Sequence, residues 1–450
     1  IIMYDNNRGE VMNNKKEQPK KTRKNKTKKE EVVEDIIVNE EENNKDNVLK
    51  RISKNSFNSI EVVVIMVITA LFGALIGSGV TYFRDNGGIR IYNKDLRELI
   101  STYHDVVDNY YGDIDSDELL ESGIKGMMEY LNDPYSSYLD SEASEEFNEK
   151  IEGEYIGLGA EIAYNSKEKT LTINTIFEDS PAAKSGLKVG DLILKIEDKD
   201  IKDLSLNEIT AIIKGGEKGS IVKLDIKRGE EELSIEFKRG TVELTSVEGR
   251  IIEKDGKKVG VIKIDIFAKN SYKQFKKVEA ELEQEGATSL IIDVRNNTGG
   301  YLTTVKSIAE MFLDKKDVMF IVKDKKTEEK QLASKNKEID LPVAILINGG
   351  SASASEILAA ALNENLGTEL VGLKTYGKGS VQKTKVLSSG ATIKYTTQKW
   401  LTPTGNSIDG KGINPTIEIE QSEKYYDTRT DEDDAQLQKA IETVLKGKSQ

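Results

Sequence analysis

The sequence contains no cysteine, and its only histidine is His104. Both scarcities argue against the zinc sites that Cys and His ligands usually form. No clustered carboxylate motif offers a replacement set of ligands, so neither a metal ion nor a cofactor is expected. A serine nucleophile in this chain would need a base other than imidazole, and lysine is the main alternative.

The charge of the chain is unevenly distributed. Residues 1–59 carry 14 Lys and Arg against 11 Asp and Glu, whereas the remainder carries 51 against 67. An acidic body argues against a nucleic-acid partner, because phosphate contacts require clustered basic side chains. The basic run from Lys20 to Lys29 is interpreted as part of a solvated, disordered tail.

A long apolar segment follows this tail. The 22 residues from Val62 to Phe83 include no charged side chain, and such a helix is long enough to cross a bilayer. A cleaved signal peptide and a buried core helix are the less favoured interpretations. The sequence therefore predicts a disordered cytoplasmic tail over 1–59 and a single-pass anchor over 60–83. The catalytic portion is then expected outside the cytoplasm, at the cell membrane.

The next two regions differ in their periodicity. In 84–150, apolar residues repeat at spacings of three and four, which predicts helices that include His104. From 151 to 239, short alternating segments between glycine turns predict strands. The run from Asp179 to Asp191, with the loop from Gly157 to Ala160, resembles PDZ domains.

The PDZ resemblance implies a peptide-binding function for this loop. In that family, loop N–H groups hold the terminal carboxylate of a peptide, and the peptide adds as a strand to the sheet edge. The corresponding residues here are Leu158, Gly159 and Ala160.

Residues 240–422 alternate between predicted strands and helices. The segments 289–295 and 341–348 are almost continuously apolar, which is typical of strands covered on both faces. Within 423–450, an amphipathic helix is expected over 431–446, with its acidic first residues at the helix N-terminus. The fold class is predicted to be multidomain, α+β and α/β.

A serine-rich run in this last block carries the main chemical hypothesis. Ser351, Ser353 and Ser355 follow Asn348-Gly349-Gly350 and precede a strong helix-forming segment. Ser353 is placed at the helix N-terminus, where the dipole and the N–H of Ala354 favour developing negative charge. The alternative is an ordinary capping serine, a role that we assign to Ser355.

Two further turns are expected beside this serine. The turn ending in Gly299-Gly300 also follows a buried strand, so the N–H of Gly299 is a second candidate oxyanion donor. Lys378 lies between two glycines, and desolvation in a cleft would lower its pKa enough for it to act as a base. Gln382 is the candidate to orient the lysine amine.

Residues 93–445 resemble the carboxyl-terminal processing peptidases, PDZ-containing serine peptidases of the tail-specific protease family. The resemblance is carried by the runs 348–357 and 376–382, with flanking matches at 133–139, 401–405 and 412–415. It implies a layered, crotonase-like peptidase core with nucleophile Ser353, base Lys378, lysine-orienting Gln382, and an oxyanion hole formed by Gly299 and Ala354.

The sequence therefore favours a membrane-anchored serine endopeptidase that cleaves proteins or peptides with free C-termini near those ends. Assembly into a homo-oligomer is a further expectation from the family. Two alternatives stay open: a catalytically inactive membrane-tethered PDZ scaffold, and a Ser–Lys amidase that acts on small amides.

Overall fold

The computed structural model describes residues 3–5 and 94–446. These residues belong to two units, one containing 94–120 and the other containing 3–5 and 121–446. The predicted anchor over 60–83, and all of the predicted tail except 3–5, lie outside the described residues. Over 3–5 and 94–446, no helix is long and apolar enough to cross a membrane.

The helices predicted after the anchor are confirmed. Asp115 precedes the second of them, and its carboxylate accepts hydrogen bonds from the first-turn N–H groups of Asp117 and Glu118. Asp140 caps the third helix in the same way, by accepting from Ala143 N. The elements of this region are α3 (Lys94–Asn109), α4 (Ser116–Tyr130), β2 (Ser137–Leu139) and α5 (Ser141–Glu152).

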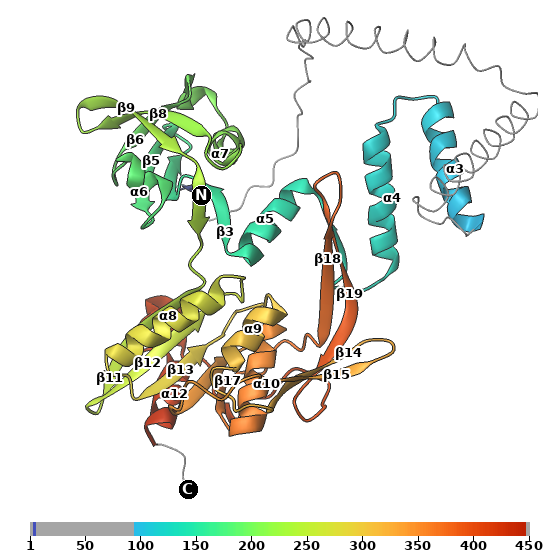
Figure 1. The fold of residues 1–450 in the computed structure, drawn as a ribbon. Coiled ribbons are helices and arrows are strands. Elements are labelled where there is room, and N and C mark those ends of the chain that lie inside the picture. Colours follow the sequence, from blue (N-terminus) through green and yellow to red (C-terminus); the bar gives the residue numbers. More distant parts are fainter. Residues whose placement is uncertain (1–2, 6–93, 447–450) are drawn as a thin grey trace, which may run out of the picture. The chain divides into compact units, whose positions relative to one another are not determined.

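A β-sheet with two short helices follows, as the short alternating segments of 151–239 predict (Figure 1). Leu158, Ile173 and Phe237 belong to its buried apolar cluster. The strand β4 pairs in parallel with β1 (Met3–Asp5), which is the edge strand of this sheet. The elements are β4 (Ala160–Asn165), β5 (Thr170–Ile176), α6 (Pro181–Ser185), β6 (Leu192–Ile196), β7 (Lys199–Asp200), η1 (Ile201–Asp203), α7 (Leu206–Lys214), β8 (Ile221–Arg228) and β9 (Glu231–Lys238).

Two strands flank this sheet in the sequence and pair with each other. They are β3 (Glu154–Gly157) and β10 (Gly240–Glu243), which run antiparallel. Because β3 precedes β4 and β10 follows β9, the segment from β4 to β9 begins and ends at one two-stranded ribbon.

A second sheet forms the centre of the remaining region, in the order β11-β12-β13-β16-β17-β20. From β12 to β20 neighbouring strands are parallel, and only β11 is antiparallel to its neighbour. The strands are β11 (Val247–Lys254), β12 (Lys257–Ile264), β13 (Ser289–Asp293), β16 (Val343–Ile347), β17 (Glu369–Gly372) and β20 (Ile417–Glu418).

Helices cover both faces of this sheet, as the nearly continuous apolar strands predict. Ile292 and Ile345 belong to a buried cluster that includes residues of α8, α9 and α10. Ile291 and Leu346, adjacent to them in the sequence, belong to a separate cluster with α12. The helices are α8 (Ser271–Gln284), α9 (Leu302–Ala309), α10 (Ala354–Leu366) and α12 (Ala435–Lys446).

A third sheet has the order β15-β14-β19-β18. Residues 399–401 of β19 pair with β14, and residues 392–394 of the same strand pair with β2. This pairing brings a segment near residue 137 beside strands near residue 394. The strands are β14 (Val318–Lys323), β15 (Glu328–Leu332), β18 (Ser380–Val386) and β19 (Thr392–Leu401).

The predicted start of the C-terminal helix is wrong. The short helix α11 (Glu423–Thr428) comes first, and α12 begins at Ala435 rather than at Asp431. Asp434 precedes α12, and its carboxylate accepts from Leu437 N at 2.9 Å. One carboxylate of the acidic run therefore caps the helix, while the preceding residues form a turn.

Candidate active site

Of Ser351, Ser353 and Ser355, at the start of α10, only Ser353 is partly exposed. Ser351 and Ser355 have 0% exposure, and their hydroxyls donate to backbone carbonyls of Val294 and Asn297. Ser353 has φ 55° and ψ −112°, a conformation that a non-glycine residue rarely adopts. The fold therefore presents one hydroxyl of the run and uses the other two to hold it.

The assignment of Ser355 as the helix cap is wrong. Ser353 occupies the N-cap position, whereas Ser355 lies in the first turn of α10. The Ser355 hydroxyl donates to Asn297 O at 2.8 Å, and Ala352 N donates to the same oxygen at 3.0 Å. These bonds join the serine run to the turn after β13. Capping preferences are local, so they could not predict this long-range contact.

The structure brings the Gly299 turn against Ser353, as the sequence predicts. A Cβ atom added to Gly299 would lie 2.9 Å from Ser353 Cβ and 3.1 Å from Ala354 N. Gly299 also has φ 108°, so a side chain there would be both strained and obstructed. Only a glycine leaves this space beside the serine open.

The two candidate oxyanion donors differ in their present partners. The Gly299 N–H donates to Asn297 Oδ1 at 2.8 Å. The Ala354 N–H, at the first position of α10, has no acceptor among the described residues. In this conformation only the second donor is unoccupied.

Lys378 lies in the loop between β17 and β18, half-buried. Burial lowers the pKa of Lys378, and the positive charge of Lys394 lowers it further, against the opposing charges of Asp133 and Glu356. Its Nζ lies 5.1 Å from the centre of the Tyr135 ring. No hydrogen bond joins Lys378 Nζ to Ser353 Oγ within the described part of the chain.

A carboxylate that sequence reasoning missed links the serine and lysine segments. Glu356 has 0% exposure, and its Oε2 accepts from Ser353 N at 2.8 Å and from Lys378 N at 2.9 Å. Its Oε1 accepts from Thr375 Oγ1 at 2.6 Å and from Gly377 N at 2.7 Å. A glutamate three residues after a cap signals a helix start, but nothing local signals the contacts with residues 375–378.

Gln382, at the start of β18, makes its contacts through the amide nitrogen. Its Nε2 donates to Ser380 Oγ at 2.8 Å and to Thr396 Oγ1 at 3.1 Å. Its Oε1 accepts no hydrogen bond from the described residues, and the side chain is not bonded to Lys378. To orient the lysine amine as predicted, Gln382 would have to accept a hydrogen bond from Lys378 Nζ through Oε1.

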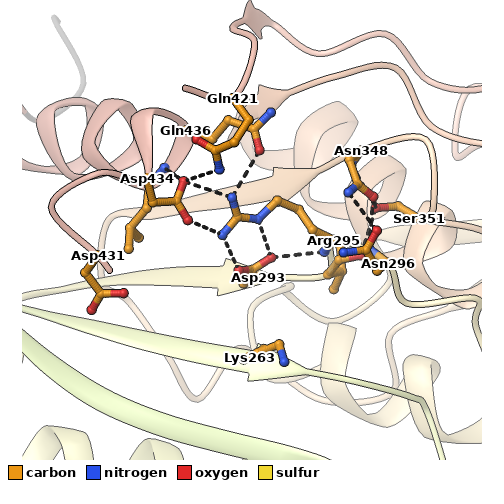
Figure 2. A network of polar contacts seen from close by, with 12 residues as sticks. Lys263, Asp293, Arg295, Asn296, Asn348, Ser351, Gln421, Asp431, Asp434 and Gln436 are labelled. Carbon is orange, nitrogen blue, oxygen red and sulfur yellow. Dashed lines mark hydrogen bonds and ion pairs between the residues drawn. The ribbon is translucent and has the colours of Figure 1, made fainter. Parts of the chain in front are cut away.

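A buried ion network lies around Arg295, which precedes the Gly299 turn in the sequence (Figure 2). Arg295, which follows β13, donates to Asp293 and to Asp434, with Nη2 at 2.7 and 2.8 Å from their oxygens. Burial opposes the charge of Arg295, but these carboxylates outweigh it and raise the pKa of Arg295 above its ordinary value. Arg295 Nη1 also donates to Gln436 Oε1 at 3.0 Å. The network thus ties β13 to α12.

The candidate carboxylate-binding loop lies between β3 and β4. Leu158 and Ala160 are buried, and Gly159 has φ 76°. A Cβ at Gly159 would lie 2.4 Å from Ser180 Cβ, so this position requires glycine. Within 3–5 and 94–446, no group of three or more His, Cys, Asp and Glu side chains is placed to hold a metal ion.

Comparisons with known proteins match three segments of this chain to described families. The family described as "Peptidase family S41" matches residues 258–419, "PDZ domain" matches 154–238, and "Activating protease CtpB N-terminal domain" matches 81–143. A solved structure, "photosystem II D1 C-terminal processing protease", is 24% identical with a TM-score of 0.41, covering 72% of this chain and 86% of its own.

Curated relatives cover most of both chains. A "probable CtpA-like serine protease" of Staphylococcus haemolyticus (strain JCSC1435) is 34% identical over 79% of this chain and 71% of its own length. A protein with the same description from Staphylococcus aureus (strain COL) is 36% identical over 79% and 72%. The family matches cover the serine run, the lysine loop and the PDZ domain, and these relatives are more than 30% identical over more than two thirds of their own length, so the chain belongs to peptidase family S41 and is a serine peptidase with a PDZ domain.

Proposed function

We propose that this enzyme cleaves proteins near their C-termini through an acyl-enzyme on Ser353, with Lys378 as the general base. The observation that carries the proposal is the Glu356 carboxylate, which binds the backbone of both residues while Ser353 keeps the only accessible hydroxyl of its run. The names of the relatives and the PDZ match support cleavage near the C-terminal ends of proteins.

The chemistry assigned to Lys378 requires its neutral amine. Nζ takes the proton of Ser353 Oγ as the oxygen bonds to the scissile carbonyl carbon, and the C–N bond breaks when the leaving nitrogen receives that proton. A water molecule then attacks the ester carbonyl carbon and gives a proton to Nζ, and Nζ passes that proton to Ser353 Oγ as the ester C–O bond breaks and the acid leaves. A lowered pKa of Lys378 supports this role because it raises the neutral fraction.

The oxyanion role is proposed for the N–H groups of Ala354 and Gly299. Ala354 N lies at a helix N-terminus and has no acceptor among the described residues, so it is available to a developing negative charge. The Gly299 N–H has to leave Asn297 Oδ1 to contribute. We propose that substrate binding drives this change and brings Lys378 Nζ from the Tyr135 ring to Ser353.

The PDZ domain is proposed to receive the substrate tail at the edge of β4, with the terminal carboxylate at Leu158, Gly159 and Ala160. The pairing of β1 with Ile162–Tyr164 supports the idea that this side of β4 accepts a further strand, although β1 runs parallel to β4, whereas a tail whose carboxylate lies at residues 158–160 would run antiparallel to it. Altering the Gly157–Ala160 loop should reduce the cleavage of long tailed substrates more than that of short peptides. Equal losses for both would contradict tail recognition.

A membrane anchor over 60–83 and an extracytoplasmic catalytic portion are also proposed, on the uncharged run in the sequence. Such an anchor would separate residues 3–5 from β4 by the bilayer, so β1 pairing and anchoring exclude each other within one molecule. Fractionation of cells, followed by protease treatment of intact cells, distinguishes the two arrangements.

The peptidase proposal is tested with peptides carrying apolar or charged C-terminal residues. Ser353→Ala and Lys378→Ala should each abolish cleavage, while Ser389→Ala and Lys385→Ala, which change exposed residues of the β18–β19 hairpin, should retain it. Absence of cleavage by the unaltered enzyme would favour an inactive PDZ scaffold. Cleavage that survives in both active-site variants would refute the assignment.

A further inference from the structure

Asp133 reaches the proposed catalytic region from outside the segment that matches the peptidase family. It precedes β2, within residues 81–143, whereas the peptidase match covers 258–419. The strand β2, which follows Asp133, pairs with β19, and Gln382 of β18 pairs with Thr396 of β19. Asp133, Thr396 and Gln382 therefore lie on adjacent segments.

A directed chain of hydrogen bonds joins these three side chains. Thr396 Oγ1 donates to Asp133 Oδ2 at 2.6 Å and accepts from Gln382 Nε2 at 3.1 Å. The hydroxyl has one proton, so once a carboxylate accepts that proton the oxygen can only accept from its other neighbour. Asp133 thereby determines that Gln382 presents its NH₂ group to Thr396.

The Asp133 carboxylate is itself held as an acceptor. Burial raises its pKa, but hydrogen bonds from Ser136, Thr396 and Tyr135 and the charge of Lys378 outweigh burial and lower the pKa of Asp133. The Ser136 hydroxyl donates to Oδ2 at 2.6 Å and the Tyr135 N–H to Oδ1 at 3.1 Å. The same carboxylate therefore fixes the backbone of Tyr135, whose ring lies beside Lys378 Nζ.

We propose that Asp133 is a positioning residue for the catalytic lysine: acting through Thr396, it turns the Gln382 amide so that Oε1 is left to bind Lys378 Nζ. Among the hydrogen-bonded side chains of Asp133, Thr396 and Gln382, Oε1 of Gln382 accepts no hydrogen bond from the described residues. The inference rests on the proposed function, because it assigns the orientation of the base used there. It also makes a segment preceding the PDZ domain part of the peptidase site.

The charge of Asp133 gives the proposal a second readout. The charged and titratable groups facing Lys378 are Lys394 of β19, Glu356 of α10, Asp133, and the Tyr135 phenol with its hydrogen-bonded partner Tyr376. Asp133 favours the protonated lysine, so its removal should lower the pKa of Lys378. The rising limb of kcat/KM against pH should then move to lower pH.

The test compares Asp133→Asn and Thr396→Val with Asp140→Asn, a control in the same segment whose carboxylate caps α5. Asp133→Asn should reduce kcat by about tenfold, the effect of losing one supporting hydrogen bond, and shift the limb to lower pH. Thr396→Val should reduce kcat similarly without removing a charge facing Lys378. Asp140→Asn should match the unaltered enzyme.

The outcomes separate the two levels of the proposal. If the unaltered enzyme cleaves peptides and Ser353→Ala does not, the proposed function stands. In that case, unchanged kcat and pH dependence in Asp133→Asn and Thr396→Val overturn the positioning role alone. If Asp133→Asn fails to fold by circular dichroism, Thr396→Val and the acceptor-preserving Asp133→Glu decide. An unchanged kcat in Thr396→Val contradicts the proposal. A kcat in Asp133→Glu that is no higher than the kcat in Asp133→Ala also contradicts it.

Discussion

Glu356 offers four acceptor positions to four donors, and no water replaces any of them because the side chain is fully buried. Hydrogen bonds to a carboxylate are stronger than those between neutral groups, and its place in the first turn of α10 is favoured by the helix dipole. A residue outside the reacting groups therefore fixes the separation of the segments that carry Ser353 and Lys378.

Replacing Glu356 with Gln should damage both stability and activity. The amide nitrogen would face two donors, which leaves buried N–H or O–H groups unsatisfied at a cost of about 3 kcal/mol in the free energy of unfolding. Cleavage should fall by roughly 100-fold. Urea denaturation and peptide cleavage measure these effects. Glu364→Gln, on the exposed end of the same helix, is the control, and equal behaviour of the two variants would contradict the role of Glu356.

Lys394 provides a test of the electrostatics of the base. Its positive charge lowers the pKa of Lys378, so Lys394→Met should raise that pKa. Because the neutral amine is the active form, the rising limb of kcat/KM should move to higher pH and activity at neutral pH should fall. Lys385→Met, which removes an exposed charge from β18, should leave the limb in place. A limb that moves to lower pH in Lys394→Met would refute the argument.

At the scale of secondary-structure elements, a buried ion pair connects the start of α12 to the residue before the Gly299 turn. Arg295 is 11% exposed and Asp434 is 3% exposed, and the bond between them joins the residue before the turn to the residue before α12 (Figure 2). The second ion pair of this region, between Arg250 and Asp431, is 42% and 37% exposed. Buried and exposed pairs on neighbouring elements therefore allow a direct comparison.

Asp434→Asn should destabilise the peptidase region by about 3 kcal/mol, because it leaves part of the Arg295 charge buried without its partner. Asp431→Asn should cost less than about 1 kcal/mol, as expected for an exposed pair. The fluorescence of Trp400, the only tryptophan and 1% exposed within the core, reports unfolding in urea. Equal midpoints for the two variants would show that the network does not support the fold.

At the scale of the whole molecule, local patterns predicted the elements, and long-range contacts determined the site. The apolar strands 289–293 and 343–347 and the helix after Ser353 follow from their own residues. The position of the Gly299 turn beside Ser353 also follows, since parallel strands end at one sheet edge.

Contacts between distant segments could not be predicted in this way. Asp133 meets Thr396 across 263 positions, and Ser355 bonds Asn297 across 58. Local propensity favoured a capping role for Ser355, but in the structure its hydroxyl donates a hydrogen bond to the backbone carbonyl of Asn297 in another turn. Glu356 fits a helix-start pattern, yet its bonds to residues 375–378 exist only in the folded core.

The most direct test of the account is the mass of the Ser353-containing peptide after rapid acid quenching of enzyme mixed with a peptide substrate. An acyl-enzyme should appear as an added mass equal to that of the N-terminal cleavage product less one water, located on Ser353 and absent from Ser353→Ala. Attachment of that product to any other residue, or undiminished cleavage by Ser353→Ala, would contradict the account.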